Sequence, residues 1–409
     1  MNKLYELIQQ LCPDGVKYKK FGNVCQYIRG ITYSKPQEVK DNSTNAWKVM
    51  RANNITLGSN VINFEDVKLV KREVYVRDNQ LLKKGDILIC AGSGSKEHIG
   101  KVAYIFDDME YTFGGFMAVI RCGNELNSRF LFHILTGNSF SVYLSQALNS
   151  TTINNLNAGI MKNYLIPVPP LEVQQEIVRI LDHFTELTAE LTAELTAELT
   201  ARKEQYIYYR NRLLAPTSQS TWMTLGDIGK VAMCKRIMKA ETSPSGDVPF
   251  YKIGTFGKEP DAYISKAKYE EYRSKYSFPK KGDILISAAG TIGRTVIYDG
   301  EPAYYQDSNI VWVENDESIV LNRYLYYYYQ LQPWSVSTGG TIARLYNDNI
   351  SKARISVPPL PEQRRIVSIL DRFDALCNDL TSGLPAEIAA RQKQYEYYRD
   401  KLLTFKERV

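Results

Sequence analysis

A run of leucines spaced four residues apart lies near the centre of the chain, within 185–200 (TELTAELTAELTAELT). Its apolar positions are Leu187, Leu191, Leu195 and Leu199. Ala, Glu and Leu favour the α-helix and neither Gly nor Pro interrupts the run, so the pattern predicts a helix. Because an α-helix turns about 100° per residue, a four-residue repeat drifts by about 40° per copy and the leucines spread over roughly 120° of the surface. Taken alone, the segment is explained as well by an ordinary solvated or self-associating helix as by a more specific role.

The helical pattern continues on both sides of this run, from Leu171 to the residues before Pro216. Two adjacent prolines, Pro169 and Pro170, cannot lie within a helix and therefore mark its start. Forty-odd residues in one helix give a rod of roughly 65 Å. A single helix of that length needs a partner to be stable in water.

Before this helix the chain predicts a different kind of structure. Residues 1–12 have the spacing of a short amphipathic helix, ended by the Pro-Asp-Gly of 13–15. Short β-like runs separated by Gly, Asn and Asp then predict a β-rich domain. The β-like runs are Trp47–Met50, Val67–Val70, Ile87–Cys90, Val102–Phe106 and Phe116–Arg121, and helical spacing appears at Arg129–Leu135 and Val142–Leu148.

The second half of the chain repeats the first. KGDIL stands at 84–88 and 281–285, VPPL at 168–171 and 357–360, and ARKEQYIYYRNRLL at 201–214 is matched by ARQKQYEYYRDKLL at 390–403. The helical blocks share one offset of 189 residues, whereas the offset in the β-rich parts varies. Helices of fixed length joined to globular parts of variable length predict a pseudo-twofold internal repeat.

We therefore predict an α+β fold in which two β-rich globular domains are joined by two long helices packed as an antiparallel coiled coil. Gly383 and Pro385 should break or kink the second helix. The predicted domains are 1–12 (a short helix packing near the C-terminal helix), 13–170 and 216–359 (globular), and 171–215 and 360–409 (helical).

Composition and charge narrow the class of protein. The 409 residues, 44% hydrophobic and 23% charged, indicate a globular chain of more than one domain. No apolar run of membrane-spanning length or signal-peptide pattern is present, and the six cysteines include no CxxC pair, so we expect a cytoplasmic protein with reduced thiols. The net charge is +6, yet 171–214 hold five Lys/Arg against eight Asp/Glu. The positive charge therefore lies mainly outside this helix.

No catalytic, metal or nucleotide site can be assembled from the sequence. The loop 94–101 superficially resembles a phosphate-binding loop, but five residues separate its glycines and Val102 stands where Ser or Thr should hold Mg²⁺. A tight turn between two strands is the better interpretation. The three histidines have no partner at metal-ligand spacing. The pattern indicates a binding protein.

Loops in both globular parts carry residue types that suit a polyanion. Arg and Lys contact phosphates and guanine, Asn contacts adenine, and small residues allow close approach of the backbone. For each residue taken alone, an ordinary solvated loop is the alternative. The candidates are Lys48, Arg51, Asn53, Asn54, Ser93, Ser95, Lys96 and Lys101 in the first part, and Lys252, Thr255, Lys258, Thr291, Arg294, Thr338 and Arg344 in the second.

Taken together, these motifs resemble the specificity subunits of type I restriction–modification systems along essentially the whole chain. The resemblance rests on the two VPPL boundaries, the helices that begin near Gln174 and Gln363, the repeated QYxYYRxxLL ends, the KGDIL and IG(K/R) motifs and the TAEL repeat. It implies two target-recognition domains held apart by a coiled-coil spacer, each reading one half of a bipartite double-stranded DNA target.

The same resemblance implies that the chain is not itself an enzyme and binds no cofactor. Two methyltransferase (modification) subunits would dock on it and use S-adenosylmethionine, and restriction/translocase subunits would use ATP and Mg²⁺; no membrane is involved. The alternatives are a coiled-coil adaptor that binds proteins and, less compatible with the missing motifs, a self-contained nuclease or methyltransferase.

Overall fold

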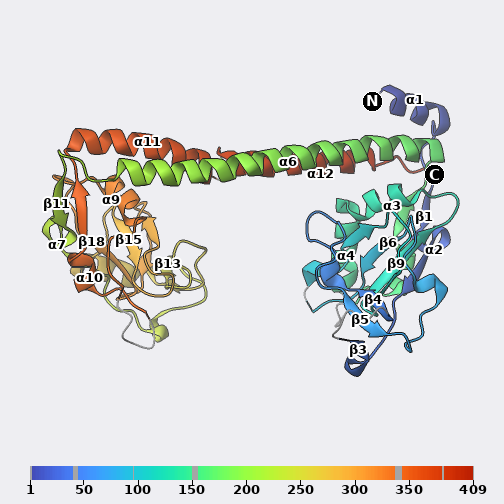
Figure 1. Ribbon diagram of the computed structural model, residues 1–409, viewed down its shortest axis with the longest axis horizontal. Helices are drawn as coiled ribbons and strands as arrows, with labels where there is room; N and C mark the ends of the chain where they lie inside the picture. Colours follow the sequence, from blue (N-terminus) through green and yellow to red (C-terminus); the bar gives the residue numbers. More distant parts are fainter. Residues whose placement is uncertain are drawn as a thin grey trace. The chain divides into compact units, whose positions relative to one another are not determined.

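The computed structural model describes residues 2–39, 45–94, 96–149, 155–336, 343–379 and 382–408. The chain folds into two units, one made of Met1–Glu194 with Ile388–Val409 and the other of Leu195–Glu387. Each unit contains one copy of the β-rich repeat together with the helical segments packed on it (Figure 1).

Two sheets form the globular part of the first unit. One is antiparallel with the strand order β2-β9-β6-β7, and the other has the order β3-β5-β4-β8, in which β4 and β8 run parallel. The first and last strands of this globular part, β1 and β10, form a separate two-stranded sheet. The bounds are β1 Tyr18–Lys20, β2 Cys25–Arg29, β3 Glu38–Val39, β4 Ala46–Met50, β5 Lys68–Lys71, β6 Ile87–Cys90, β7 Val102–Tyr104, β8 Tyr111–Phe113, β9 Met117–Cys122 and β10 Leu165–Pro167.

The central strand β6 is buried on both faces, which explains why it reads as an unbroken apolar run. Ile87 and Ile89 belong to the core shared with the helices, and Leu88 and Cys90 to a second core on the opposite face. The helices of this unit are α1 Asn2–Leu11, α2 Phe21–Val24, α3 Ser128–Leu135, α4 Asn138–Asn149 and α5 Ala158–Asn163.

The second unit repeats this topology, except that no described strand corresponds to β3. The order β12-β18-β15-β16 matches the first sheet, β14-β13-β17 matches the second including its parallel pair, and β11-β19 matches the short pair. The duplication predicted from the sequence is thus confirmed at the level of the fold. The bounds are β11 Thr221–Thr224, β12 Val231–Ala232, β13 Val248–Tyr251, β14 Tyr263–Ile264, β15 Ile284–Ser287, β16 Thr295–Ile297, β17 Tyr304–Tyr305, β18 Ile310–Val313, β19 Arg354–Val357, α7 Leu225–Ile228, α8 Lys266–Lys275, α9 Asn322–Tyr329 and α10 Asn347–Ser351.

The long helices have the bounds α6 Leu171–Leu213, α11 Leu360–Asn378 and α12 Leu384–Leu402. In the first unit α6 packs on α12, where the hydroxyls of Thr185 and Tyr395 lie 2.9 Å apart. In the second unit α6 packs on α11, where the rings of Tyr209 and Phe373 stack at 5.7 Å. The predicted pairing of the helices is confirmed within each unit (Figure 1).

The leucine array is not uniformly buried. Leu187 is 46% exposed, whereas Leu195 is 8% exposed. This gradient agrees with the rotation of a four-residue repeat around a helix that has 3.6 residues per turn.

The predicted break in the C-terminal helix lies between α11 and α12. A Cβ atom at Gly383 would lie 2.6 Å from the carbonyl oxygen of Ala375 and 2.7 Å from that of Asp379, so the chain can turn here only with glycine. Leu384 and Pro385 then begin α12, where the missing amide proton of proline costs nothing.

A buried glutamine fastens each globular part to its long helix. Gln174 on α6 is 0% exposed, donates to the carbonyl oxygens of Glu125 and Pro169 and accepts from the amide of Asn127. Gln363 on α11 is also 0% exposed and makes the same three bonds, to Ile319, Pro358 and Leu321. The two junctions are therefore built alike.

The N-terminal helix α1 lies on the first unit. Lys3 forms an ion pair of 3.0 Å with Glu176 of α6. The chain after α1 bonds to the C-terminal segment, since the amide of Val16 donates to the carbonyl oxygen of Lys406. The exact domain boundaries stay predictions.

Candidate nucleic-acid interface

A groove of about 950 Å³ opens on the globular part of the first unit, at the ends of the strands. Four loops and Asn155 line it: the segment after β2, the turn η2 (Ala52–Asn54), the glycine-containing end of β6 and the turn between β8 and β9. The lining residues are Ile31, Thr32, Tyr33, Arg51, Ala52, Asn53, Gly92, Ser93, Gly94, Gly114, Gly115, Phe116, Met117 and Asn155.

Three of the residues predicted from the sequence come together in this groove, namely Arg51, Asn53 and Ser93. The guanidinium of Arg51 is held at its rim by Asp66, with Nη2 2.5 Å from Oδ2. Asn53 is exposed, and its backbone carbonyl accepts a hydrogen bond from the side chain of Asn63. A basic side chain and an amide side chain beside small residues are suited to contact base edges and phosphates.

The sequence reasoning missed two other residues of the groove. Phe116 is 73% exposed, and its ring lies over Gly92, where a Cβ atom would come within 3.0 Å. Arg29 holds the groove together from below, donating to the carbonyl oxygen of Gly115 at 2.7 Å and to Asn155 at 3.3 Å. An aromatic residue directly after two glycines, Gly114 and Gly115, was the available signal.

Asn54 does not belong to the surface, which corrects its prediction as a contact residue. It is 0% exposed, its side-chain oxygen accepts from the amide of Arg51 at 2.8 Å, and its side-chain nitrogen donates to the carbonyl oxygen of Asn63 at 3.1 Å. Because both ends of the amide are used, Asn54 shapes the turn η2 and offers nothing to a ligand.

Lys101 is likewise turned inward. Its ammonium donates to the carbonyl oxygens of Ala52 and Ile55, at 3.1 and 2.8 Å, and burial lowers its pKa. These two bonds direct the ammonium toward η2, and its role as a DNA contact stays a prediction. The two bonds hold the loop that carries Asn53 in place.

Arg294, at the matching place in the second unit, does the same for the matching loop. Its Nη1 donates to the carbonyl oxygen of Phe256 at 2.9 Å. The IG(K/R) motif thus supplies a basic residue that bonds to the carbonyl oxygens of a neighbouring loop in both repeats.

The groove of the first unit and the matching region of the second share further backbone bonds. The amide of Leu156 donates to Ala91 in the first unit, and the amide of Leu345 donates to Ala288 in the second. This register places Arg344 where the first unit has Asn155. Arg344 donates to the carbonyl oxygen of Ser308 at 2.6 Å.

The other candidates of the second unit occupy the loops around this position. Lys252 forms an ion pair with Asp261 at 2.8 Å, and its amide donates to the hydroxyl of Thr255 at 3.1 Å. Thr291 and Lys258 are exposed. The amide of Ile253 donates to the side chain of Gln306, which directly follows β17.

The remaining candidates lie away from the grooves or outside the described residues. Lys48 is exposed on β4, with its ammonium 5.1 Å from the centre of the Tyr111 ring. Ser95, Thr338 and the side chain of Lys96 lie outside the described residues.

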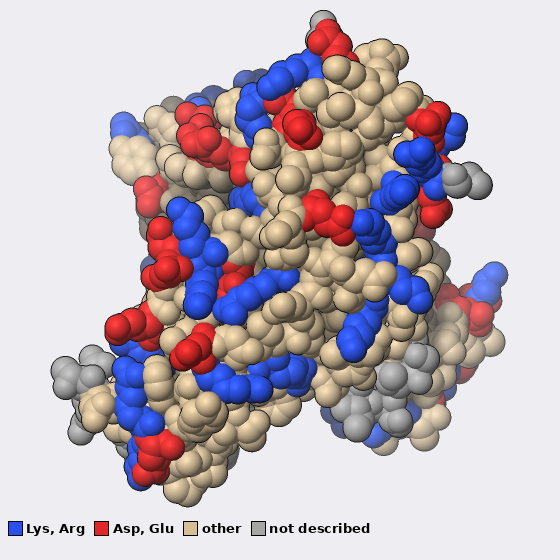
Figure 2. Space-filling view, turned by 90° about the vertical axis from the view of Figure 1, so that its right-hand side faces the viewer, with Lys and Arg blue, Asp and Glu red and all other residues tan. Residues whose placement is uncertain are grey.

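Basic and acidic side chains are interspersed on the face shown in Figure 2 and do not merge into one continuous basic surface. An interface formed here would depend on individual basic residues placed among other contacts, more than on one broad field.

The described part of the chain contains no group of His, Cys, Asp and Glu that could hold a metal ion. Among the described helices, none is long and apolar enough to cross a membrane. His133 lies in the core beside Asp182, and all six cysteines are free thiols.

Comparison with known proteins assigns the family. Residues 13–201 and 219–390 match the type I restriction modification DNA specificity domain. A type I restriction enzyme specificity subunit of Haemophilus influenzae is 57% identical over 291 residues, covering 70% of this chain and 74% of that protein. The EcoR124I/EcoR124II specificity subunit of Escherichia coli is 35% identical over 254 residues, covering 58% of this chain and 61% of that protein.

Two solved structures share the fold. A chain from a study of complex assembly and conformational transition in a type I R-M system has a TM-score of 0.67 at 19% identity, covering 95% of this chain and 97% of that one. The HsdS subunit from Thermoanaerobacter tengcongensis has a TM-score of 0.52 at 18% identity, covering 96% of both chains. The chain belongs to the type I restriction–modification DNA specificity family, whose subunits recognise DNA and are not catalytic.

Proposed function

We propose that this chain recognises a bipartite, asymmetric duplex target, one half through each globular part. The observation that supports this most directly is the duplication: the sheet orders β2-β9-β6-β7 and β12-β18-β15-β16 match, and each repeat has a loop braced by the basic residue of its IG(K/R) motif. The loops around the two braces differ in sequence, so each groove would read its own bases.

Specificity in this proposal comes from simultaneous engagement of both half-sites. One groove alone would bind weakly, because a few contacts to base edges and phosphates must offset the cost of association. Joining two readers converts the second contact into an intramolecular event, and this gain is lost when the spacing is wrong. The continuous helix α6 and its partners α11 and α12 would set that spacing.

The chain would also be the scaffold for two copies of a methyltransferase subunit. In support, the repeated QYxYYR segments leave equivalent tyrosines in the open. Tyr208 is 56% exposed and accepts a hydrogen bond from Arg212, and Tyr397 is 61% exposed with Lys401 5.9 Å from its ring. Exposed aromatic residues beside a cation are typical anchors at protein interfaces. S-adenosylmethionine, and ATP with Mg²⁺ where restriction subunits join, would be bound by those partners.

The test uses the full chain purified with its methyltransferase subunit. Selection from a random duplex library should return two short half-sites at one fixed gap, and nuclease footprinting should protect both. The chain alone should transfer no methyl group. A complex that binds every duplex equally, with no motif enriched, would favour the adaptor alternative and refute the proposal.

A further inference from the structure

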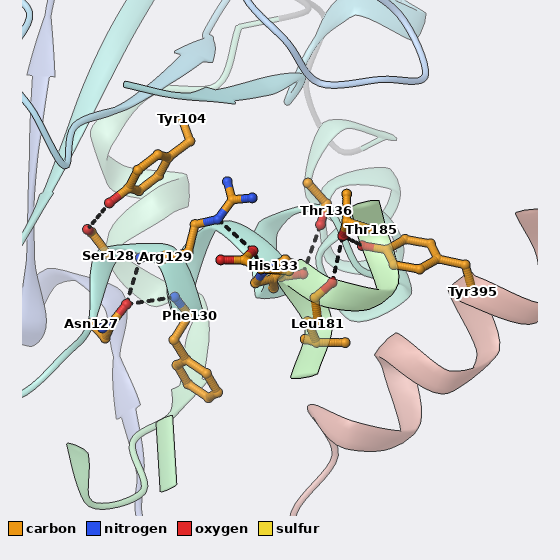
Figure 3. Close-up of polar contacts among 11 residues, drawn as sticks. Tyr104, Asn127, Ser128, Arg129, Phe130, His133, Thr136, Leu181, Thr185 and Tyr395 are labelled. Carbon is orange, nitrogen blue, oxygen red and sulfur yellow. Dashed lines mark hydrogen bonds and ion pairs between the residues drawn. The ribbon is translucent and has the colours of Figure 1, made fainter. Parts of the chain in front are cut away.

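An aspartate on the long helix of the first unit is held by two side chains of the globular part. Arg129 and His133 both come from α3, and Arg129 Nε and His133 Nε2 each lie 2.8 Å from Oδ1 of Asp182 on α6. Figure 3 shows Arg129 and His133 directed toward this helix, with Thr185 one turn further along it bonded to Tyr395. The three side chains form what we call the first clamp.

The first clamp has a defined charge state. His133 is 1% exposed, and its Nδ1 has no hydrogen-bond partner among the described residues, so a proton there would be buried without an acceptor. Burial lowers the pKa of His133 more than its bond to Asp182 raises it. The neutral imidazole therefore donates its Nε2 proton to a charged carboxylate.

The second unit contains an equivalent clamp. Arg323 and Tyr327 on α9 both reach Asp371 on α11, with Arg323 Nε at 2.6 Å and the Tyr327 hydroxyl at 2.5 Å from Oδ1. Asp371 follows Asp182 by the offset of 189 residues that relates the helical blocks. The arginine and the residue four positions later are likewise repeated, with tyrosine in place of histidine.

The clamps contribute little to holding the fold together. The carboxylates of Asp182 and Asp371 are 40% and 43% exposed, and ion pairs that water reaches add little to the free energy of folding. Each junction already has its buried glutamine and the core beneath it. Each clamp does, however, constrain the orientation of two helices. Both donors come from one helix and the carboxylate from the other, so the hydrogen bonds weaken when the helices rotate relative to each other.

We propose that Asp182 and Asp371 are positioning residues, each of which holds one reading groove at a fixed angle to its long helix and so makes recognition strict for the gap between the half-sites. This role rests on the proposed bipartite function. The length of the helices would set the preferred gap between the half-sites. The clamps would determine how strongly the complex rejects targets with a different gap.

The experiment measures gap selectivity with the full chain in complex with its methyltransferase subunit. After the wild-type target has been selected, binding is compared on duplexes whose gap is one base pair shorter, equal or one longer. Asp182→Ala and Asp371→Ala should retain both half-sites and lose about tenfold of the preference for the wild-type gap, the change that one charge-assisted hydrogen bond can supply.

Three further variants make the result specific. Arg129→Lys keeps the charge but loses the planar fork, so it should relax the gap in the same direction with little risk to folding. His133→Tyr copies the second clamp and should preserve selectivity. Glu198→Gln removes an exposed ion pair of α6 to Arg202 that contacts neither groove, and should change nothing.

The two hypotheses fail separately. A wild-type complex that selects no bipartite target refutes the proposed function and the positioning role with it. A wild-type complex with a strict gap, together with equally strict Asp182→Ala and Arg129→Lys complexes, refutes the positioning role alone. Thermal unfolding midpoints equal to that of the wild type would show that a relaxed gap is not a consequence of unfolding.

Discussion

The Nζ of Lys101 lies 2.8 Å from the carbonyl oxygen of Ile55, and with its bond to Ala52 it fixes the loop that carries Asn53 into the groove. A basic residue that the sequence suggests for ligand contact is thus directed toward the neighbouring loop. Arg294 repeats this relationship in the second unit through Phe256.

Replacing Lys101 with methionine should therefore impair reading of one half-site without removing a phosphate contact. The partly buried carbonyl oxygen of Ile55 would lose this donor, whereas that of Ala52 would keep the amide of Ile55, so the free energy of unfolding should fall by roughly 1 kcal/mol. Lys101→Arg, which copies the second unit, should retain specificity. Denaturant unfolding measures the first effect and library selection the second. A uniform loss of affinity on all duplexes with a smaller salt dependence would instead identify Lys101 as a phosphate contact.

Asn54→Ala should destabilise the first unit by roughly 1–3 kcal/mol, because the buried side chain of Asn54 would be lost together with its bonds to the amide of Arg51 and the carbonyl oxygen of Asn63. The neighbouring exposed Asn53→Ala is the matched control and should leave the unfolding midpoint unchanged. Equal midpoints for the two variants would contradict the interior role of Asn54.

The two exposed candidates Asn53 and Lys48 should behave differently in binding. Asn53→Ala should relax one position of one half-site, by about 1–3 kcal/mol against the wrong base, and leave the other half-site intact. Lys48→Ala should weaken binding to all duplexes alike and reduce the salt slope by about one. Library selection and a salt titration distinguish the two patterns, and a shared pattern would show that both residues have the same kind of contact.

The stability of the first unit should fall in mild acid because of His133. Burial lowers its pKa in the folded state, so between that value and the ordinary value of 6.5 the unfolded chain binds more protons. The contribution is complete above about pH 6.5 and is lost as the pH decreases, by at most ~1.4 kcal/mol per pH unit. Asp182, whose pKa is lowered from 3.8 by His133 and Arg129 against the opposing effect of burial, acts only at lower pH.

Denaturant unfolding between about pH 7.5 and 5.5 measures this slope. His133→Tyr should flatten it, whereas replacement of the exposed His183 by glutamine should not. A slope that persists in His133→Tyr would assign the proton uptake to another group.

The sequence predicts those elements whose buried residues form either a regular apolar stripe on a helix or an unbroken apolar run in a strand. Ile87–Cys90 was bounded correctly because it is apolar on both faces, and α6 because no helix breaker stands between Pro170 and Pro216. The duplication was predictable because the helical blocks keep one offset. The glycine of the predicted break, Gly383, lies where the structure has no room for a Cβ atom.

The candidate interface was less predictable, since residue type does not determine which way a side chain turns. Lys101 and Arg294 were predicted as DNA-contacting residues, and only the position of the neighbouring loops shows that their side chains bond to those loops. Asn54 differs from Asn53 by one position in a tight turn, which is enough to bury one amide and expose the other. Phe116 was missed because it was taken as the first residue of an apolar strand, whereas β9 begins at Met117 and Phe116 lies in the turn before it.

Deleting one TAEL copy, Thr192–Leu195, should change the gap between the half-sites by one or two base pairs and leave the half-sites unaltered. The deletion shortens α6 by ~6 Å and rotates its ends by ~40°, and one base pair of B-DNA rises ~3.4 Å. Insertion of an extra copy should shift the gap in the opposite direction, which separates a change of length from general damage to the helix. Library selection with each variant complex measures the gap that it prefers. An altered half-site at an unchanged gap would mean that the helix influences reading itself, and that the clamps at Asp182 and Asp371 do not isolate the grooves from it.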